Sequence, residues 1–379
     1  MNILFITHLY PLSEESNNSF ALHYFVREWN KNNNIQVLRI YYPMDDEPLP
    51  LKNNVEIDSV KIDIVKPFWI PILKKSFVRK KNILNLLRFN PDVIICHLYN
   101  SYFTFSFLKK YFDVPFIIGI HRSDVLLAKN LFYRWRINKS VQNTDLIVYR
   151  SLAIKNSFEK IIKTSDNTFI AWSGIPEFLI RKAKKTLQLS KSYKETKTFI
   201  SVCRLIKLKQ IDKVIESLNQ LKQEGYNWKY TIIGDGPERK KLENLASKYS
   251  LKEQIFFLGR LPRERVFEIL SENEFFVMPS YNETFGLAYL EAMANGCIVL
   301  GSEKWGIDGI IEDSYNGILC DAHDYESLFR KIKMIFNYNN YELKKIQSRS
   351  LKTVMNFNET EMAHKYLKAI SEYTDKDYN

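Results

Sequence analysis

Short apolar runs separated by amphipathic stretches recur along the first half of the chain. A β-branched, apolar run at 2–7 is followed by a polar loop and by a stretch at 20–30 with helical spacing of its apolar residues. Further strands are predicted at 36–42, 91–96, 115–120 and 145–149. Because apolar runs that alternate with helices are typical of βαβ units, we expect a parallel sheet covered on both faces.

The same alternation starts again after residue 197. It predicts helices at 211–224, 239–249, 263–271 and 284–294, and strands at 198–202, 230–233, 254–258, 275–279 and 298–301. Two such series predict an α/β protein built from two Rossmann-like, doubly wound domains.

A basic, polar stretch separates the two series. From Arg181 to Lys197 the chain holds six Lys and one Arg, and Glu195 is its single acid. Charge runs of this kind are typical of linkers. We therefore expect an N-terminal domain at 1–185, a C-terminal domain at 186–355, and a C-terminal helix and tail at 356–379 that returns to the N-terminal domain.

The composition and the patterns of apolar, basic and cysteine residues indicate the cellular compartment of the protein. Hydrophobic residues make up 45% of the 379 residues and charged residues 26%, as in ordinary globular proteins. The first eight residues lack the basic region of a signal peptide, and the weakly charged run at 93–108 is too polar for a membrane span. The four cysteines lie far apart, which favours a reducing compartment. We expect a cytoplasmic protein, with peripheral attachment to the inner face of the cell membrane as a variant.

Positive charge is concentrated in the first half of the chain. The net charge is +12, and residues 1–172 carry 23 Lys and Arg against 15 Asp and Glu. Seven basic residues and no acid lie between Lys66 and Arg88, mixed with aromatics such as Phe68, Trp69 and Phe77. This mixture suits an anionic membrane surface or a nucleic-acid backbone. A solvated helix face beside a core-facing stripe explains it equally well.

Chemistry-bearing residues of the second series follow the predicted strands. Ligands of such sheets bind at the carboxyl ends of the strands, where helix N-termini present free N–H groups. Arg204 and Lys209 follow the first strand there and could neutralise a diphosphate, although two ordinary surface cations would look the same. Glu283 and Glu291 flank seven residues after the fourth strand, with Thr284 as the expected N-cap. Each carboxylate is either solvated or an acceptor for ligand hydroxyls.

Taken together, these motifs resemble the retaining GT-B glycosyltransferases of family 4, the large "group 1" family. The family's Glu, seven residues, Glu motif is similar to Glu283 through Glu291, and Ala-Met-Ala-x-Gly follows it at 292–296. The family's Arg-Leu-x-x-x-Lys element matches residues 204–209, and residues 233–239 match its strand-to-helix turn. The resemblance is specific over residues 198–320 and looser over the rest of the chain.

The resemblance implies a fold and an activity. The fold would be GT-B, with two facing Rossmann-like domains, an inter-domain cleft, the acceptor on the N-terminal domain and the nucleotide sugar on the C-terminal one. The enzyme would move a sugar, with retention, from a UDP- or GDP-linked donor to a saccharide or lipid-linked acceptor, in cell-surface polysaccharide synthesis. It would need neither a metal nor another cofactor, because protein cations replace Mg²⁺ at the diphosphate.

The resemblance also implies roles for matching residues. Arg204 and Lys209 would bind the donor diphosphate, and Glu291 the ribose hydroxyls. Glu283 would face the donor sugar, with backbone N–H groups near Phe285 and Gly286 on its hydroxyls or phosphate. His121, after a strand of the first domain, would lie near the anomeric centre. The expected catalytic residues are therefore Glu283, His121, Arg204 and Lys209.

Some positions depart from the family, and other functions stay open. Residues from Asn17 to Phe20 stand where the family has glycines, so a ligand contact of that loop is open. The six histidines show no ligand-like spacing, and an Asp-x-Asp pattern occurs only in the tail, so no metal site is expected. The alternatives are a sugar-nucleotide epimerase or a phosphorylase on the same fold, and a basic membrane- or nucleic-acid-binding module. We expect no nucleic-acid partner, because that module leaves the carboxylate and diphosphate motifs unexplained.

Overall fold

The computed structural model describes residues 1–13, 20–42, 52–66, 68–70, 75–189 and 193–374. By its internal contacts the chain divides into two compact units. Unit 1 comprises Met1–Arg150, Ile154–Ser173 and the C-terminal segment from Glu359, and unit 2 comprises Ser151–Ala153 and Gly174–Asn358. The main division therefore lies at Ser173/Gly174 rather than at 185/186.

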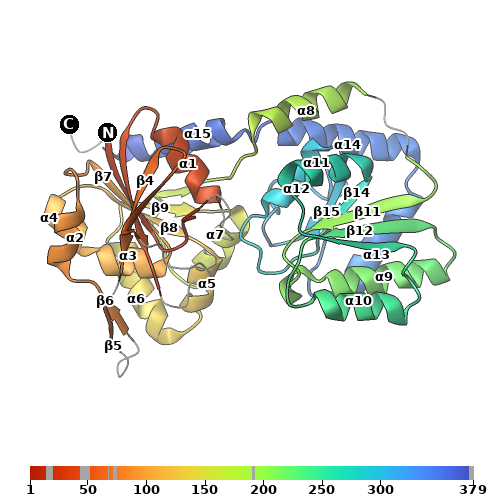
Figure 1. Ribbon diagram of the computed structural model, residues 1–379, viewed down its shortest axis with the longest axis horizontal. Coiled ribbons are helices and arrows are strands. Elements are labelled where there is room, and N and C mark those ends of the chain that lie inside the picture. The colour runs from red at the N-terminus through yellow and green to blue at the C-terminus, as the bar shows by residue number, and fades with distance from the viewer. Residues whose placement is uncertain (14–19, 43–51, 67, 71–74, 190–192, 375–379) are drawn as a thin grey trace. The chain divides into compact units, whose positions relative to one another are not determined.

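Unit 1 is built on an eight-stranded sheet with the order β10-β9-β8-β7-β1-β2-β4-β3 (Figure 1). Neighbouring strands are parallel except β3 and β4, and the inner strands are buried, as expected of a sheet covered on both faces. The strands of this sheet are β1 (Asn2–Thr7), β2 (Asn34–Ile40), β3 (Asn54–Ile57), β4 (Val60–Val65), β7 (Val93–His97), β8 (Phe116–Ile120), β9 (Leu146–Tyr149) and β10 (Thr168–Ile170). A separate hairpin consists of β5 (Phe68–Ile70) and β6 (Lys75–Phe77).

The helices of unit 1 include one from the far end of the chain. Helix α15 lies alongside α1 (Figure 1), where Trp29 Nε1 donates to the carbonyl oxygen of Ala363 at 2.8 Å and Arg27 pairs with Glu359 at 2.7 Å. The helices are α1 (Ala21–Trp29), α2 (Lys80–Leu86), α3 (Tyr99–Phe105), α4 (Phe107–Phe112), α5 (Arg122–Ala128), α6 (Leu131–Gln142), α7 (Leu152–Glu159), whose first residues group with unit 2, and α15 (Glu359–Thr374).

Unit 2 holds a six-stranded, wholly parallel sheet with the order β13-β12-β11-β14-β15-β16. The strands are β11 (Lys197–Val202), β12 (Trp228–Ile233), β13 (Ile255–Gly259), β14 (Phe275–Val277), β15 (Ile298–Ser302) and β16 (Ile318–Cys320). The helices are α8 (Glu177–Gln188), the 3₁₀ turn η2 (Lys207–Lys209), α9 (Ile211–Gln223), α10 (Arg239–Lys248), α11 (Arg263–Glu272), α12 (Leu287–Ala294), α13 (Tyr325–Asn337) and α14 (Asn340–Val354). The prediction of an α/β protein with two doubly wound sheets is confirmed.

The first half of the expected linker is a helix rather than a loop. Leu179, Ile180 and Ala183 of α8 are buried, at helical spacing, and α8 packs against α12 and α14 of the same unit. Arg181, Lys184 and Lys185 lie on the opposite, solvent-facing side. The first half of the charge run is therefore part of the polar face of an amphipathic helix, whereas Lys197, at the start of β11, is buried.

Within the part of the chain that the structure describes, no helix is both long enough and apolar enough to cross a membrane.

Candidate functional site

Three loops of unit 2 meet at the carboxyl edge of its sheet. They follow β11, β12 and β14, and their backbones are joined by hydrogen bonds. The amide of Leu205 donates to the carbonyl oxygen of Asp235 at 2.9 Å, and the amide of Tyr281 donates to that of Leu208 at 3.1 Å. The loop that carries the predicted cations is thus held on both sides by neighbouring loops.

Two glycines allow this close approach of backbones. A Cβ on Gly234 would lie 1.9 Å from the carbonyl oxygen of Cys203, and one on Gly236 would lie 2.4 Å from that of Leu205. Gly234 also has a φ of +128°, which side-chain-bearing residues rarely adopt. The Gly-Asp-Gly sequence is therefore a packing requirement of the loop that contains Arg204.

Two residues predicted from separate motifs form an ion pair at this edge. Lys209 Nζ pairs with Glu283 Oε2, and the two side chains are only 16% and 17% exposed. The other carboxylate oxygen of Glu283 accepts from the amide of Thr284 at 3.1 Å. Residues 74 positions apart are thus brought together, as the resemblance implies. A diphosphate at this edge would compete with Glu283 for the ammonium group of Lys209.

The turn into α12 differs from the prediction. The helix begins at Leu287, with Gly286 rather than Thr284 at the N-cap. Gly286 has a φ of +83°, and a Cβ there would lie 2.6 Å from the ring of Tyr289. This left-handed residue ends the 278–286 loop abruptly and starts the helix three residues later than its sequence pattern suggests. The side chain of Phe285 is buried, so only its backbone can face a ligand.

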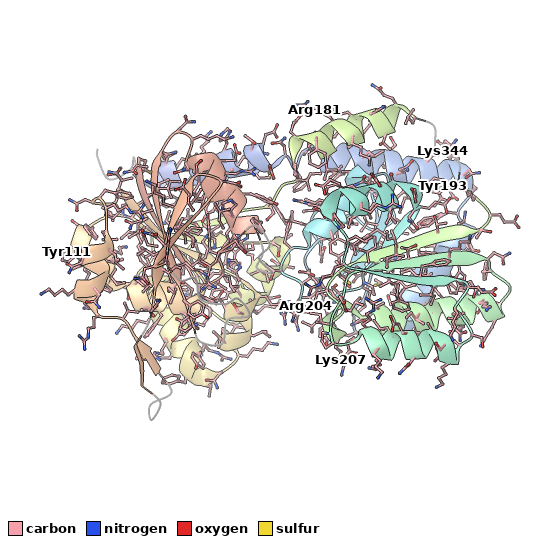
Figure 2. All side chains as sticks on the ribbon, in the orientation of Figure 1. Tyr111, Arg181, Tyr193, Arg204, Lys207 and Lys344 are labelled. Atoms are coloured by element: carbon pink, nitrogen blue, oxygen red, sulfur yellow. The ribbon has the colours of Figure 1, made fainter. Side chains whose placement is uncertain are left out.

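The remaining predicted residues of unit 2 lie at the same edge and on α12. Arg204 is exposed at the strand ends, and Lys207 is exposed farther along the same loop (Figure 2). Glu291 is 13% exposed, and its Oε1 accepts from Arg263 Nη2 of α11 at 2.5 Å. No local pattern marks Arg263 as the partner of Glu291, because the two residues belong to different helices.

In unit 1 the half-buried His121 is joined by hydrogen bonds to the buried His97 and Tyr366. His121 Nε2 and His97 Nδ1 share a hydrogen bond of 2.9 Å, and His97 Nε2 shares one of 3.1 Å with the hydroxyl of Tyr366. A neutral imidazole donates at one nitrogen and accepts at the other, so the tautomers of the two histidines are linked. Burial, with the nearby charge of Arg150, lowers the pKa of His97, and burial followed by His97 and Arg150 lowers the pKa of His121.

Asp124 fixes the turn that carries His121. Its carboxylate accepts from the amide of His121 at 2.7 Å, from the amide of Tyr99 at 2.6 Å and from the hydroxyl of Tyr102 at 3.2 Å. Burial raises the pKa of Asp124 to about 7. The His-x-x-Asp spacing at a helix start resembles a capping box and could have identified this residue.

Arg150, which follows β9, is a buried cation in the same unit. It is 2% exposed, donates through Nη2 to the hydroxyl of Ser173, and has its guanidinium carbon 4.8 Å from the ring centroid of Phe25. Among the described residues its Nη1 has no hydrogen-bond partner. Burial lowers the pKa of Arg150 to about 10, which still leaves it charged at neutral pH.

The lowered pKa of His97 predicts a loss of stability in acid. Below pH 6.5 the unfolded chain binds a proton at this residue that the folded chain does not, so stability falls as the pH falls. We expect His97→Gln to reduce the loss of unfolding free energy between pH 7.5 and 5.5 by about 1 kcal/mol. Urea titrations at both pH values measure this difference.

The comparison of the wild type with His97→Gln separates the effect of His97 on the pH dependence of stability from that of Asp124. The raised pKa of Asp124 acts in the opposite direction, because its contribution is lost as the pH rises toward about 7. His364→Gln, at an exposed position of α15, is the matched control and should leave the pH dependence unchanged. Equal pH dependence in the wild type and His97→Gln would contradict the assignment.

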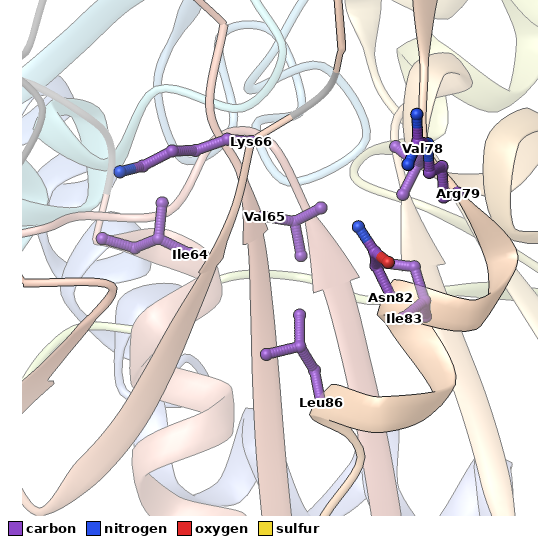
Figure 3. A pocket seen from close by; sticks show the side chains of 8 residues that line it. All are labelled: Ile64, Val65, Lys66, Val78, Arg79, Asn82, Ile83 and Leu86. Atoms are coloured by element: carbon purple, nitrogen blue, oxygen red, sulfur yellow. The ribbon is translucent and has the colours of Figure 1, made fainter.

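Two predicted regions are described only in part. Residues 17–19 of the first loop lie outside the described residues, as do 67 and 71–74 of the basic segment. Lys66 and residues within 78–86 of that segment line, with Ile64 and Val65, a cavity of about 270 Å³ between β4 and α2 (Figure 3). Lys66 and Arg79 stand on opposite sides of this cavity, with Val65 and Asn82 between them.

Within the described ranges, no three His, Cys, Asp or Glu side chains gather as the ligands of a metal ion would.

The family that this chain resembles is matched by residues of its C-terminal half. Residues 183–350 match the family described as glycosyl transferases group 1. An uncharacterized glycosyltransferase of Methanocaldococcus jannaschii is 27% identical over 73% of this chain and 76% of its own length. The N-acetyl-alpha-D-glucosaminyl L-malate synthase of Bacillus anthracis is 25% identical over 62% of this chain and 63% of its own length, so the chain spans less than two thirds of that relative. The amylovoran biosynthesis glycosyltransferase AmsK of Erwinia amylovora is 32% identical over 39% of this chain and 38% of its own length.

Solved structures match nearly the whole chain. HepE of Anabaena, in complex with UDP, has a TM-score of 0.74 at 15% identity and covers 98% of this chain and 100% of its own. Sucrose-phosphate synthase of Thermosynechococcus elongatus has a TM-score of 0.73 at 17% identity and covers 98% of both chains. Likeness at these identities shows the fold, and the GT-B prediction is confirmed.

Proposed function

We propose, from the match of residues 183–350 to the family described as glycosyl transferases group 1, that the chain moves a sugar from a nucleotide diphosphate sugar to a saccharide or lipid-linked acceptor, with retention and without a metal. The observation that carries the proposal is the meeting of Lys209 and Glu283 at the carboxyl edge of the unit 2 sheet. A cation and a carboxylate at that edge suit the two parts of such a donor, its diphosphate and its sugar.

The residues of unit 2 have distinct roles in this proposal. Arg204 and Lys209 bind the diphosphate and stabilise the charge that grows on the leaving nucleotide. Glu283 accepts hydrogen bonds from the sugar, and the backbone at Phe285 and Gly286 contributes N–H groups. Once a donor displaces Glu283 from Lys209, both side chains gain a ligand partner, so neither half-buried charge is left unpaired.

The residues of unit 1 act on the acceptor side. In this proposal His121 acts near the anomeric centre, and Asp124 holds the turn that presents it. Nε2 of His121 is held by the hydrogen bond with His97, which fixes the orientation of the ring. The unsatisfied Nη1 of Arg150 favours an acceptor that carries a phosphate or a carboxylate.

The choice of donor and acceptor is supported by the names of similar proteins rather than by particular residues of this chain. HepE was solved with UDP, which supports a UDP-linked donor, while a GDP-linked donor stays in the proposal. AmsK is named for amylovoran biosynthesis, which supports a role in polysaccharide synthesis. A lipid-linked acceptor would bring the enzyme to the inner face of the cell membrane, and the segment Lys66 to Arg88 is one surface for that contact. One of its cations, Arg88, pairs with Asp63 at 2.6 Å, which weakens that segment's charge.

Substitution of Glu283 and of Glu291 should have different effects on nucleotide binding. We expect Glu291→Ala to weaken binding of free UDP or GDP at least tenfold, because the ribose hydroxyls remain in the ligand without the sugar. We expect Glu283→Ala to lower transfer with less effect on free nucleotide. Titration calorimetry with each nucleoside diphosphate measures both.

The control for this experiment is Arg263→Ala, which removes the partner of Glu291 but keeps its carboxylate. This variant should bind nucleotide better than Glu291→Ala does. An equal loss of nucleotide affinity in Glu283→Ala and Glu291→Ala would contradict the assigned roles.

A further inference from the structure

Helix α6 of unit 1 exposes a group of large apolar side chains. Leu131, Phe132 and Trp135 are 76%, 55% and 64% exposed, and their positions place them on one face of the helix. On the core side of the helix, Ile137 and Val141 are buried. The helix is therefore apolar toward solvent as well as toward the core, whereas an ordinary surface helix has a single apolar stripe.

The same helix and its approaches are basic. Lys129, Arg134, Arg136 and Lys139 lie in a span, residues 126–144, that contains no Asp or Glu. The cations lie beside the exposed rings. The guanidinium carbon of Arg136 is 5.0 Å from the ring centroid of Phe132, and Lys139 Nζ is 5.9 Å from that of Trp135.

The elements packed against α6 do not neutralise it. Helix α3 has no acidic residue, and the one acid of α5, Asp124, is buried and bonded to backbone amides. The positive charge of the helix therefore faces solvent together with its apolar side chains.

We propose that this surface, the α6 face (Lys129, Leu131, Phe132, Trp135 and Lys139), binds an anionic lipid bilayer. Leu131, Phe132 and Trp135 insert at the level of the headgroups, while the flanking cations contact lipid phosphates. A second copy of the chain fits less well, because a two-fold interface would set the same cations against each other. The proposal rests on the proposed function, because a lipid-linked acceptor would bring the enzyme to a membrane. Vesicle binding itself requires no nucleotide sugar.

Vesicle flotation of the full chain tests the α6 face. The wild type should float at low salt with vesicles of phosphatidylglycerol and phosphatidylcholine, and should not float with phosphatidylcholine alone. The triple change Leu131→Ser, Phe132→Ser and Trp135→Ser should weaken binding at least tenfold. Lys129→Glu with Lys139→Glu should weaken it at least about 25-fold, from about fivefold for each lost cation.

Matched controls come from unit 2. Tyr341 is 73% exposed, and Tyr341→Ser should float like the wild type. Lys240→Glu with Lys248→Glu, at exposed positions of α10, should float with at most a modest loss. In addition, Trp135 fluorescence should shift to the blue on vesicle binding, and Trp135→Phe should lose that part of the shift while still floating.

Three outcomes would overturn the proposal. The first is a wild type that fails to float on the anionic vesicles, or α6 variants that float equally well. The second is loss of flotation only on Lys80→Glu with Lys81→Glu, which would move the surface to the basic segment. The third is a wild-type dimer in sedimentation velocity that the triple change converts to a monomer, because the α6 face would then join two copies. Flotation without sugar transfer would count against the proposed function alone.

Discussion

Arg204→Ala and Lys209→Ala should each lower the rate of sugar transfer by two to three orders of magnitude while the chain stays folded. In the proposed function each cation binds a diphosphate whose negative charge grows in the transition state, and one such contact typically contributes about 2.7–4 kcal/mol. The effect should fall on kcat more than on donor KM, because the contact strengthens as the leaving group departs. Initial rates over a donor concentration series measure the split.

The matched control is Lys207→Ala, in the same loop. Lys207 is exposed like Arg204 but lies outside the predicted motif positions, so transfer should change less than twofold. In Lys209→Ala the carboxylate of Glu283 also loses its ion-pair partner. The double variant Lys209→Met with Glu283→Gln removes both charges, so its comparison with Lys209→Ala separates the loss of the cation from the effect of an unpaired carboxylate. Normal turnover in both alanine variants would remove the diphosphate assignment.

Gly119→Ala should destabilise unit 1 by about 3 kcal/mol or more. A Cβ at this position would lie 2.0 Å from His97 Nδ1, and Gly119 is the register partner of His97 in the β7–β8 pair. The imidazole cannot move away easily, because it stacks on Phe5 at 5.2 Å and bonds to Tyr366. Overpacking of this kind costs about 1–3 kcal/mol, and the lost hydrogen bonds add about 1 kcal/mol each.

A double-mutant cycle tests whether the imidazole is the cause. If the clash is with His97, Gly119→Ala should cost little in a His97→Ala background, since the ring is already gone. Gly225→Ala is the control, because nothing lies within 4 Å of a Cβ there and only the cost of its positive φ remains. Additive losses in the cycle, measured by hydrogen exchange of the β8 amides, would show that the backbone rather than the ring resists the substitution.

Buried strands and local motifs could be predicted from the sequence. The bounds of β1 are the predicted ones, because its apolar run is buried almost along its whole length. The Gly-Asp-Gly turn at 234–236 and the cation loop before it lie where their motifs indicated, since each depends on a few neighbouring residues. By contrast, the lysine-rich α8 reads as a linker until the packing of Leu179 and Ile180 is known.

The rest of the candidate site depends on contacts between distant residues. Tyr366 meets His97 across 269 positions, and no local pattern marks either residue as a partner of the other. Arg263 and Glu291 meet only because α11 and α12 are neighbours in unit 2. The start of α12 was wrong by three residues because a left-handed Gly286 overrides the helical propensity of the residues before it.

The most direct test of the central claim is a donor panel on the purified full chain. UDP-, GDP- and ADP-sugars are added without acceptor and without divalent metal, and thermal stabilisation and slow hydrolysis are measured for the wild type and Lys209→Ala. The account predicts that one nucleotide class stabilises the wild type and is slowly hydrolysed with EDTA present, and that Lys209→Ala loses the hydrolysis. Stabilisation by no nucleotide sugar, or hydrolysis that is unchanged in Lys209→Ala, would contradict it.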